Sequence, residues 1–527
     1  MMPAARRSGI LVPLFSAPST GSWGIGDIGD IGPLTAWLGG AGQRILQLLP
    51  LNEMAPGTQS PYSAMSAMAI DPIYIRMPAV PDFAAVGGEA ALGVEACAAL
   101  ADVRRAERVE YARIRPIKEQ ALRAAFEHFL VREWQQGSAR AQSFAAFVAD
   151  QAWWLDDYAL FRALHERHLG TAWTGWPEPL RARHPDALEA ARQVLQPSIR
   201  FFQYAQWIGD GQWAEARAAA RANGVQLFGD LPFLVDTHSA DVWRHQARFR
   251  LDRSVGVPPD AFSATGQDWG MPPYDWDALR AADFDWLRDR ARRSADLFDG
   301  YRVDHLVGFY RTYSRPRDGQ GEPEFSPADE DAQQALGEAV LGIFREPGTE
   351  IVAEDLGVVP DFVRASLERL AVPGFRVFRW ERLWNEPGQP FRDPAGYPPR
   401  SVATSGTHDT EPLRTWWDAA DADERTAMAA VPSVVAAASG DDLLAAPFVP
   451  HVRDALLQAL FGAGSDIVLC PIQDIFGWDD RINEPATVND RNWSYRLPWP
   501  IDELGAQPEA AERQATLREW ARRYRRL

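Results

Sequence analysis

The chain has 527 residues, a formal net charge of −18 at pH 7 and a sequence pI of about 5.0. An acidic surface repels phosphate backbones and anionic membranes, so we expect neither nucleic acid nor a membrane as a partner. The chain is 46% hydrophobic, which supplies a large core, and no stretch approaches the ~20 apolar residues of a membrane span. A barrel of roughly 250 residues with insertions would use this length economically.

The first apolar run, residues 9–15, follows an Arg-Arg pair, as in secretory and twin-arginine signals. The run is short and Pro13 interrupts it, so we interpret it as the first strand of a barrel. The two cysteines, Cys97 and Cys470, are too far apart in sequence to make a disulfide framework or a zinc pattern. A reducing compartment fits them, and we predict a cytoplasmic protein.

Strand-like runs recur along the chain, each ending in polar or glycine-rich residues. They are residues 9–15, 44–51, 225–233, 300–306, 350–356, 375–380, 401–409 and 466–474. Most are too apolar to alternate, which is typical of parallel strands buried on both faces. Helical segments separate several of them, such as 213–222, which ends before Gly224, and 361–370. Eight strands alternating with helices predict an α/β fold, a (β/α)8 TIM barrel.

Two connections are longer than a barrel needs. Residues 85–215 separate the second and third runs; within them, 118–132 carries an apolar face and 143–169 is rich in aromatic residues. We interpret 85–215 as a largely helical insertion and 418–459 as a smaller helical insertion. Residues 1–527 then form one barrel domain with additions.

Two motifs suggest chemistry that their context does not support. Residues 24–29 match G-x-G-x-x-G, but residues 16–23 separate them from the first strand and no ribose-binding acid follows at the right place. We interpret this segment as a glycine-rich βα loop. His165 and His168 lie one residue short of the H-E-x-x-H spacing, and a solvated helix face is the simpler interpretation. We predict neither a metal nor an organic cofactor.

Carboxylates at the ends of strand-like runs are the informative pattern, because barrel active sites lie at that face. Asp304, Glu354 and Asp409 follow the fourth, fifth and seventh runs. Each has a polar neighbour suited to orienting a ligand, namely His305, Asp355 and His408. Arg302 precedes Asp304 by two residues, so a strand places both side chains on one face, where the cation keeps the carboxylate ionised. For this motif alone, a structural Arg–Asp pair is the alternative.

Two of these carboxylates suit retaining cleavage of a glycosidic bond, which needs carboxyl groups roughly 5–5.5 Å apart. One attacks the anomeric carbon, and the other, with a raised pKa, protonates the leaving oxygen. Asp304 and Glu354 on neighbouring strands meet this need, and Asp409 is placed to bind sugar hydroxyls and favour ring distortion. Any one of the three can be structural, but three on one barrel face favour a functional site.

Blocks of sequence from Gly9 to about Arg496 resemble a known family. They are Ser60-Pro61-Tyr62-Ser63, Gly229-Asp230-Leu231-Pro232, Ser239-Ala240-Asp241-Val242-Trp243, the run from Gly256 to Gly270, Arg302-Val303-Asp304-His305, Glu354-Asp355-Leu356-Gly357, Gly406-Thr407-His408-Asp409 and Pro471-Ile472-Gln473-Asp474. Together they resemble the amylomaltase family (4-α-glucanotransferase, or disproportionating enzyme), relatives of the α-amylases. The run 256–270 is particular to this family, whereas the short R-x-D and E-D-L-G blocks are shared more widely.

The resemblance implies that Asp304 is the nucleophile, Glu354 the acid/base and Asp409 the transition-state stabiliser, with no metal or organic cofactor in the chemistry. It also implies a set of substrate-binding residues: Tyr62, Asp260, Trp269, Arg302, His305 and His408. Residues 256–275 would form an active-site loop arching over the cleft, with Trp269 as a stacking platform.

Three segments depart from the family's common pattern: Met271 after Trp-Gly, residues 410–412 after His-Asp, and residues 483–487, which lack the usual glycine. They bear on substrate preference and on the ratio of transfer to hydrolysis, and they leave the three carboxylates intact.

The resemblance implies a retaining α-1,4-glucanotransferase that acts on malto-oligosaccharides or on glucans derived from starch or glycogen, as a monomer or weak homo-oligomer. The nearest alternative is an α-glucan hydrolase with the same residues. A glucan-binding protein on a decayed barrel and a dinucleotide-dependent oxidoreductase are alternatives of other classes. Maltose use and glycogen turnover both remain open as pathways.

Overall fold

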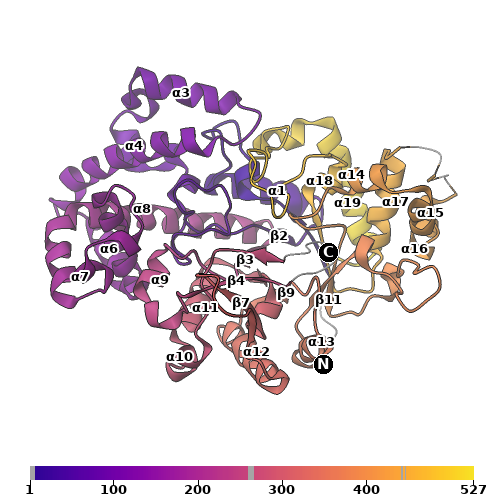
Figure 1. Ribbon diagram of the computed structural model, residues 1–527. Coiled ribbons are helices and arrows are strands. Elements are labelled where there is room, and N and C mark those ends of the chain that lie inside the picture. The colour runs from indigo at the N-terminus through magenta and orange to yellow at the C-terminus, as the bar shows by residue number, and fades with distance from the viewer. Residues whose placement is uncertain (1–5, 259–265, 441–442, 445–446) are drawn as a thin grey trace.

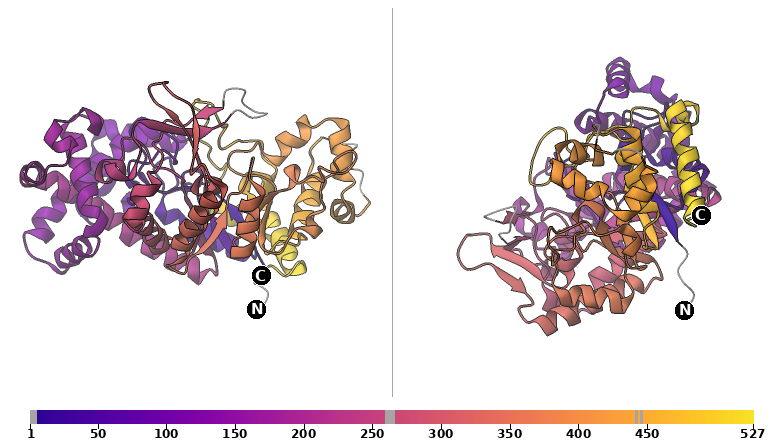
Figure 2. Two further views of the ribbon diagram at one scale, coloured as in Figure 1. Left: turned by 60° about the horizontal axis from the view of Figure 1, so that its bottom comes forward. Right: turned by 90° about the vertical axis from the view of Figure 1, so that its right-hand side faces the viewer.

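The computed structural model describes residues 6–258, 266–440, 443–444 and 447–527 (Figures 1 and 2). Within these residues, parallel strands close into a barrel in the order β1-β12-β11-β10-β9-β6-β3-β2. They are β1 (Arg7–Leu11), β2 (Ile45–Gln47), β3 (Gln226–Leu231), β6 (Gly300–Val303), β9 (Glu350–Ala353), β10 (Gly374–Val377), β11 (Ser401–Thr404) and β12 (Ile467–Pro471). The predicted (β/α)8 barrel is confirmed.

The predicted strands all exist but end earlier than the apolar runs do. The run 300–306, for example, contains β6, which ends at Val303, and the run 225–233 contains β3, which ends at Leu231. The residues beyond the strands are apolar because the loops pack as tightly as the strands: Leu306 and Phe233 are both buried. Hydrophobicity therefore marked each strand without marking the start of its loop.

The barrel interior is a core of its own. Large apolar side chains from six strands fill it: Ile45, Phe228, Val352, Phe375, Val402, Ile467 and Leu469. Gly9 on β1 faces the same region, since a Cβ there would meet Leu469 Cδ2 at 2.8 Å. Alternate residues of each strand point outward to the surrounding helices, as the two-residue period of a strand requires.

Helices surround the barrel, and contacts pass from helix to helix in two arcs, α8–α1–α19–α17 and α11–α12–α13 (Figure 1). These helices are α1 (Ile31–Gly40), α8 (Pro185–Ala222), α11 (Asp285–Leu297), α12 (Glu330–Arg345), α13 (Asp361–Leu370), α17 (Pro450–Phe461) and α19 (Pro508–Arg523). Short helices complete the connections: α9 (Ala240–Arg244), α10 (Trp276–Ala281) and α18 (Ile472–Phe476). In the described chain, none of the helices combines the length and hydropathy needed to cross a bilayer.

Between β2 and β3 the chain is mostly helical and extends to one side of the barrel, violet to magenta in Figure 1. It contains α2 (Pro81–Ala85), α3 (Val94–Arg105), α4 (Tyr111–Phe129), α5 (Ala139–Asp150), α6 (Ala152–Arg167) and α7 (Glu178–Arg181), and then α8. The 38-residue helix α8 packs on the outlying α6 and on α1 beside the barrel, so this single helix connects the helical segment to the barrel.

A second helical group lies between β11 and β12, on the other side of the barrel in Figure 1. Its helices are α14 (Leu413–Ala419), α15 (Ala422–Ala429) and α16 (Pro432–Ala438), followed by α17. The two groups therefore flank the barrel.

A small antiparallel sheet of order β5-β4-β7-β8 was not predicted from the sequence. Its strands are β4 (Arg253–Val257), β5 (Gln267–Asp268), β7 (Thr312–Pro316) and β8 (Glu324–Ser326), and it stands out from the barrel in Figure 2. The strands are short and carry many polar residues, so no apolar run indicates them. Pairing between β4 and β7, on either side of β6 in the chain, holds the sheet together.

The glycine-rich segment 24–29 is a βα loop between β1 and α1 that packs on a buried ion cluster. Arg76 reaches Asp27 at 2.9 Å and Asp30 at 2.5 Å, and both carboxylates are buried. A Cβ at Gly29 would lie 2.5 Å from Arg76 Nε, so only glycine admits the guanidinium here. The other two glycines of the segment pack against backbone, since a Cβ at Gly24 would lie 2.6 Å from the Val103 carbonyl oxygen and one at Gly26 2.0 Å from that of Leu14.

Replacing Arg76 by methionine would remove the cation that forms salt bridges with two buried carboxylates. We expect Arg76→Met to lower the free energy of unfolding by about 3 kcal/mol, since a buried charge that has lost its partner costs this much. Denaturant unfolding followed by fluorescence measures it. The matched control is Arg105→Met, whose pair with Asp102 is exposed (71% and 51%) and should contribute at most about 1 kcal/mol. Equal effects of the two variants would contradict the expectation.

Candidate active site

A buried guanidinium gathers three carboxylates at the carboxyl ends of neighbouring barrel strands. Arg302 Nη1 contacts Asp230 Oδ2 at 2.7 Å and Oδ1 at 2.9 Å. Its Nη2 lies 2.9 Å from Asp304 Oδ1 and 3.9 Å from Glu354 Oε2. Strand register brings these groups together, because Asp230 on β3 is paired with Arg302 on β6. The predicted pairing of Arg302 with Asp304 is present, within a larger network.

Asp304 and Glu354 lie side by side because their strands are in register. Val303 of β6 is paired with Ala353 of β9, so the next residue along each strand carries the carboxylate. The Glu354 N–H donates to the Val303 carbonyl at 3.0 Å, which extends the pairing by one residue. Both carboxyl groups keep some exposure, 24% for Asp304 and 14% for Glu354, so a ligand can reach them.

The surroundings of Glu354 favour its protonated form. Burial raises the pKa of Glu354 to about 7; the Arg302 charge opposes the rise and the Asp304 charge adds to it. The backbone N–H of His305 donates to Glu354 Oε2 at 2.8 Å, and His305 adopts a left-handed backbone (φ 42°) to present it. A carboxyl group with this pKa is suited to general acid and base catalysis near neutral pH.

The surroundings of Asp409 favour its ionised form. Asn483 Nδ2 donates to its Oδ1 at 2.6 Å, and His408 Nε2 lies 3.3 Å from its Oδ2. Partial burial raises the pKa of Asp409, but His408 and these hydrogen bonds outweigh that effect and lower the pKa to about 2. Arg481 also donates to the Asp409 carbonyl at 2.7 Å. Asp409 is therefore a fixed negative charge.

Aromatic rings connect the two halves of the site. The Tyr62 hydroxyl donates to Asp230 Oδ2 at 2.8 Å, and its ring stacks on His408 with centroids 5.2 Å apart. Trp493 lies against both rings, at 5.7 Å from Tyr62 and 5.8 Å from His408. Burial and the Asp230 charge raise the pKa of Tyr62, so the phenol stays protonated and donates.

Trp269 and His305 form the wall beside Asp304. Their ring centroids are 4.9 Å apart in an edge-to-face arrangement, and Trp269 is half-buried. Burial lowers the pKa of His305 to about 4, so its imidazole is neutral at neutral pH. The remaining predicted binding residue, Asp260, lies outside the described residues.

One expected ligand-orienting residue is used elsewhere. Asp355 accepts from the Phe375 N–H at 2.7 Å and from Arg376 at 3.2 Å, so it fastens the start of β10. Its backbone continues from Glu354, and successive side chains of an extended chain point in opposite directions. The expectation for Asp355 was therefore wrong, whereas His305 and His408 both lie at the site.

Sequence reasoning missed four residues that complete the site: Asp230, Arg481, Asn483 and Trp493. Asp230 had a detectable signal, because it stands at the end of the third predicted strand, where barrel catalytic residues occur. Nothing in the sequence links the other three to Asp409 or His408, because they come from a loop long after β12. In the part of the chain that the structure describes, no group of three His, Cys, Asp or Glu is arranged to hold a metal ion.

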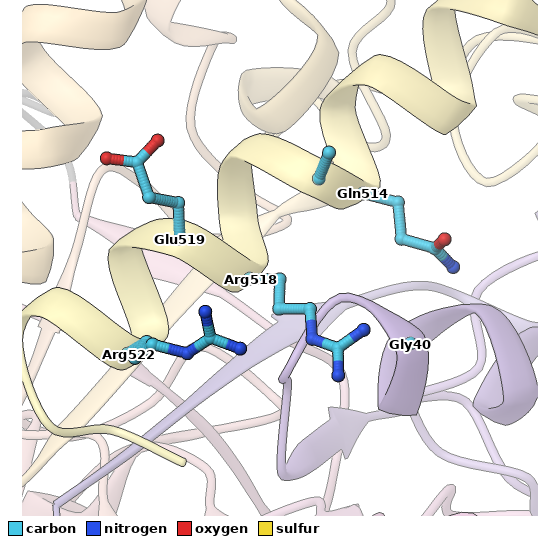
Figure 3. Close-up of a pocket in the computed structure, with 6 residues that line it drawn as sticks. Gly40, Gln514, Arg518, Glu519 and Arg522 are labelled. Atoms are coloured by element: carbon cyan, nitrogen blue, oxygen red, sulfur yellow. The ribbon is translucent and has the colours of Figure 1, made fainter.

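A surface hollow of about 470 Å³ lies apart from this site, between the end of α1 and α19 (Figure 3). Gly40, Gln514, Arg518 and Arg522 are among its lining residues. Because α1 leads into β2, the hollow is at the amino-terminal face of the barrel. Active sites of this fold lie at the opposite, carboxyl-terminal face. The chemistry therefore belongs to the Arg302 face.

Comparisons with known proteins identify the family of the chain. A family model described as 4-alpha-glucanotransferase matches residues 12–502. The 4-alpha-glucanotransferase of Thermus thermophilus is 33% identical, covering 97% of this chain and 100% of its own length. The chloroplastic/amyloplastic enzyme of Solanum tuberosum is 32% identical, covering 94% and 82%. The amylomaltase of Streptococcus agalactiae, solved in complex with acarbose, superposes with a TM-score of 0.81 at 26% identity, covering 99% of both chains.

Replacing Asp304 by asparagine tests the electrostatics of the pair. Because the Asp304 charge raises the pKa of Glu354, Asp304→Asn should lower that pKa from about 7 by about one unit. Infrared difference titration of the carboxyl band measures it, with Glu354→Gln identifying the band. The control Asp423→Asn removes an exposed carboxylate on α15 and should leave the pKa unchanged. An unchanged or raised value in Asp304→Asn would refute the coupling.

Proposed function

The chain belongs to the 4-alpha-glucanotransferase family, and from this premise we propose how its residues transfer an α-1,4-glucan segment from a donor to the 4-hydroxyl of an acceptor. The observation that carries the proposal is the Asp304–Glu354 pair on Arg302. One carboxyl group is salt-bridged to the guanidinium at 2.9 Å, and the pKa of the other is raised to about 7, chiefly by burial. This is the division of roles that retaining glycoside chemistry needs.

In the first step Asp304 attacks the anomeric carbon of the donor while the protonated Glu354 gives its proton to the departing glucan oxygen. A covalent glycosyl-enzyme forms on the Asp304 carboxylate. In the second step Glu354 takes the proton of the acceptor 4-hydroxyl, whose oxygen displaces Asp304. Two displacements at the same carbon retain the configuration.

The other residues bind and orient the sugar. Asp409, with its pKa lowered to about 2, offers a permanent acceptor to sugar hydroxyls and stabilises positive charge that develops on the ring in the transition state. Arg302 and His408 support the carboxylates, Tyr62 lines the donor side, and the Trp269 ring stacks on a sugar ring. His305 and Asp260 complete the set of binding residues.

Transfer dominates hydrolysis when an acceptor sugar outcompetes water for the glycosyl-enzyme. We propose that residues 256–275 form a loop that helps to exclude water and to bind the acceptor. Two observations support this proposal: the flanking strands β4 and β5 pair with each other, and Trp269, directly after β5, contacts the His305 ring.

We further propose a single catalytic barrel domain over 1–527, with helical insertions at 85–215 and 418–459. The substrates are malto-oligosaccharides and glucans derived from starch or glycogen, in maltose, starch or glycogen metabolism. The two free cysteines, Cys97 and Cys470, support a cytoplasmic enzyme, and the net charge of −18 supports one that binds neither nucleic acid nor membranes. We expect a monomer or a weak homo-oligomer, with chemistry that needs no cofactor or metal.

Maltotriose distinguishes transfer from hydrolysis. The purified protein should convert it into glucose or maltose and a ladder of longer oligomers, with the total of reducing ends constant, because each transfer makes one bond for each bond it breaks. Chromatography of the products and a reducing-end assay measure both quantities. Rising reducing ends without longer products would make the protein a hydrolase instead.

The variant Glu354→Gln tests the acid/base. It should lower transfer by about 10³-fold, within the range for a general acid–base group, and still bind maltotriose. Glu346→Gln is the control, because Glu346 pairs with Arg288 on the surface at the end of α12. Full activity of Glu354→Gln would show that another group supplies the proton.

The pH dependence follows from the protonation state of Glu354. Donor cleavage needs Glu354 protonated, and its pKa is raised to about 7. The kcat/KM for maltotriose should therefore fall as the pH rises through about 7, since it is proportional to the fraction of enzyme in which Glu354 is protonated. Rates across pH 3.5–9 at constant ionic strength check this. A basic limb near the usual pKa of glutamate, about 4.3, would contradict the assignment.

A further inference from the structure

A small cavity lies inside the barrel, directly beneath the carboxylate site. Its volume is about 10 Å³, and residues of β1, β2, β6, β10, β11 and β12 line it together with the segment after β11. Leu11, Phe375 and Leu469 supply apolar surface, and Thr404 and Thr407 supply small polar side chains. Three larger polar side chains also line it: Gln47, Arg302 and His408. The cavity therefore joins a barrel-core residue to two residues of the active site.

Each of these three polar side chains has one buried atom without a hydrogen-bond partner among the described residues. The atoms are Gln47 Nε2, Arg302 Nε and His408 Nδ1. The side chains are almost completely buried, with residue exposures of 2%, 4% and 2%. Other atoms of two of these groups are engaged, since Arg302 binds carboxylates through both Nη atoms and His408 contacts Asp409 through Nε2.

Buried polar atoms are nearly always paired, with protein or with an internal water molecule. A cavity of this size accommodates about one water molecule, which commonly makes three hydrogen bonds. The guanidinium Nε–H can only donate, and a protonated imidazole donates from Nδ1. The two lone pairs of one water oxygen match these two donors.

The Gln47 amide supplies the acceptor that the water then needs. Amide oxygen and nitrogen have nearly the same shape, so the hydrogen-bond network decides which of them faces a cavity. With its oxygen turned inward, Gln47 accepts a hydrogen from the water. An anion fits this cavity less well, because Arg302 already binds Asp230 and Asp304 and their negative charges lie close by.

We propose that one water molecule occupies this cavity, accepting hydrogen bonds from Arg302 Nε and His408 Nδ1 and donating one to Gln47. Gln47 is thereby a positioning residue that acts on the active site through the water. The water fixes the imidazole so that Nε2 faces Asp409. The water site depends on geometry alone, whereas its effect on turnover rests on the proposed function.

The consequence is a dependence of His408 protonation on Gln47. The charged groups that face His408 are Asp409, Arg302 and Asp230, and the neutral rings of Tyr62 and Trp493 pack on it. Burial lowers the pKa of His408, and Asp409 raises it above its usual value. The imidazolium also needs an acceptor at Nδ1, which the water provides while the Gln47 amide accepts a hydrogen from it.

A high-resolution crystal structure of the unaltered protein tests the site directly. We expect density for one water within hydrogen-bond distance of Arg302 Nε and His408 Nδ1, with the Gln47 amide oxygen toward it. A cavity without density, or density with the anomalous signal of an anion such as bromide after a bromide soak, would overturn the proposal. This result depends neither on a variant folding nor on glucan transfer.

Nitrogen-15 NMR of histidine-labelled protein tests the linkage. Among the nine histidines, His408 is identified from the spectrum of His408→Gln. In Gln47→Met, which keeps the length of the side chain and removes the acceptor, the pKa of His408 should fall by about one unit. Gln47→Glu retains an oxygen acceptor and should not lower it.

The control is Gln333→Met, which removes another buried amide, on α12, that donates to the Pro327 carbonyl. It should leave the pKa of His408 unchanged. The same pKa in Gln47→Met as in the unaltered protein would overturn the positioning role. Because the readout is a titration, loss of glucan transfer for other reasons cannot imitate it.

Discussion

The active site depends on one buried guanidinium. Arg302 is 4% exposed and binds Asp230 at 2.7 Å and Asp304 at 2.9 Å, with Glu354 at 3.9 Å. A buried cation is tolerated only when paired carboxylates compensate for its lost hydration. Removing either Arg302 or its carboxylate partners alone would therefore leave a buried charge unpaired and destabilise the fold. Because the partners come from three adjacent strands, β3, β6 and β9, the pairing of these strands assembles the site.

Around that cation, two carboxyl groups are driven to opposite protonation states. Burial acts on both Glu354 and Asp409, but Glu354 has the negative Asp304 beside it, whereas Asp409 has His408 and the Asn483 amide. Their pKa values, about 7 and about 2, are therefore far apart. This separation lets one site hold a proton donor and a permanent negative charge together at neutral pH. The rings of Tyr62 and His408 connect Asp409 to the Arg302 cluster, because His408 contacts Asp409 and Tyr62 donates to Asp230.

Some of this organisation could be read from the chain. The apolar runs predicted each barrel strand, and Asp304, Glu354 and Asp409 were found because they follow those runs. The glycine-rich segment 24–29 was assigned to a βα loop by its distance from the first strand. The small antiparallel sheet escaped prediction, since its strands are too short and polar to show a pattern: β5 has two residues. The prediction that Asp355 orients a ligand was wrong because its position next to Glu354 in the sequence does not show which way its side chain points.

The sequence by itself determined the barrel and the positions of its carboxylates, because strand hydrophobicity and strand ends are local properties of the chain. It also determined that Arg302 and Asp304 share a face, since the two-residue period of a strand requires it. Only the tertiary structure decided that Asp230 shares the same cation, that Asn483 and Arg481 hold Asp409, and that Gln47 reaches the cavity under His408. These contacts join segments far apart in the chain, and burial, which sets the protonation of Glu354, exists only once those segments have packed together.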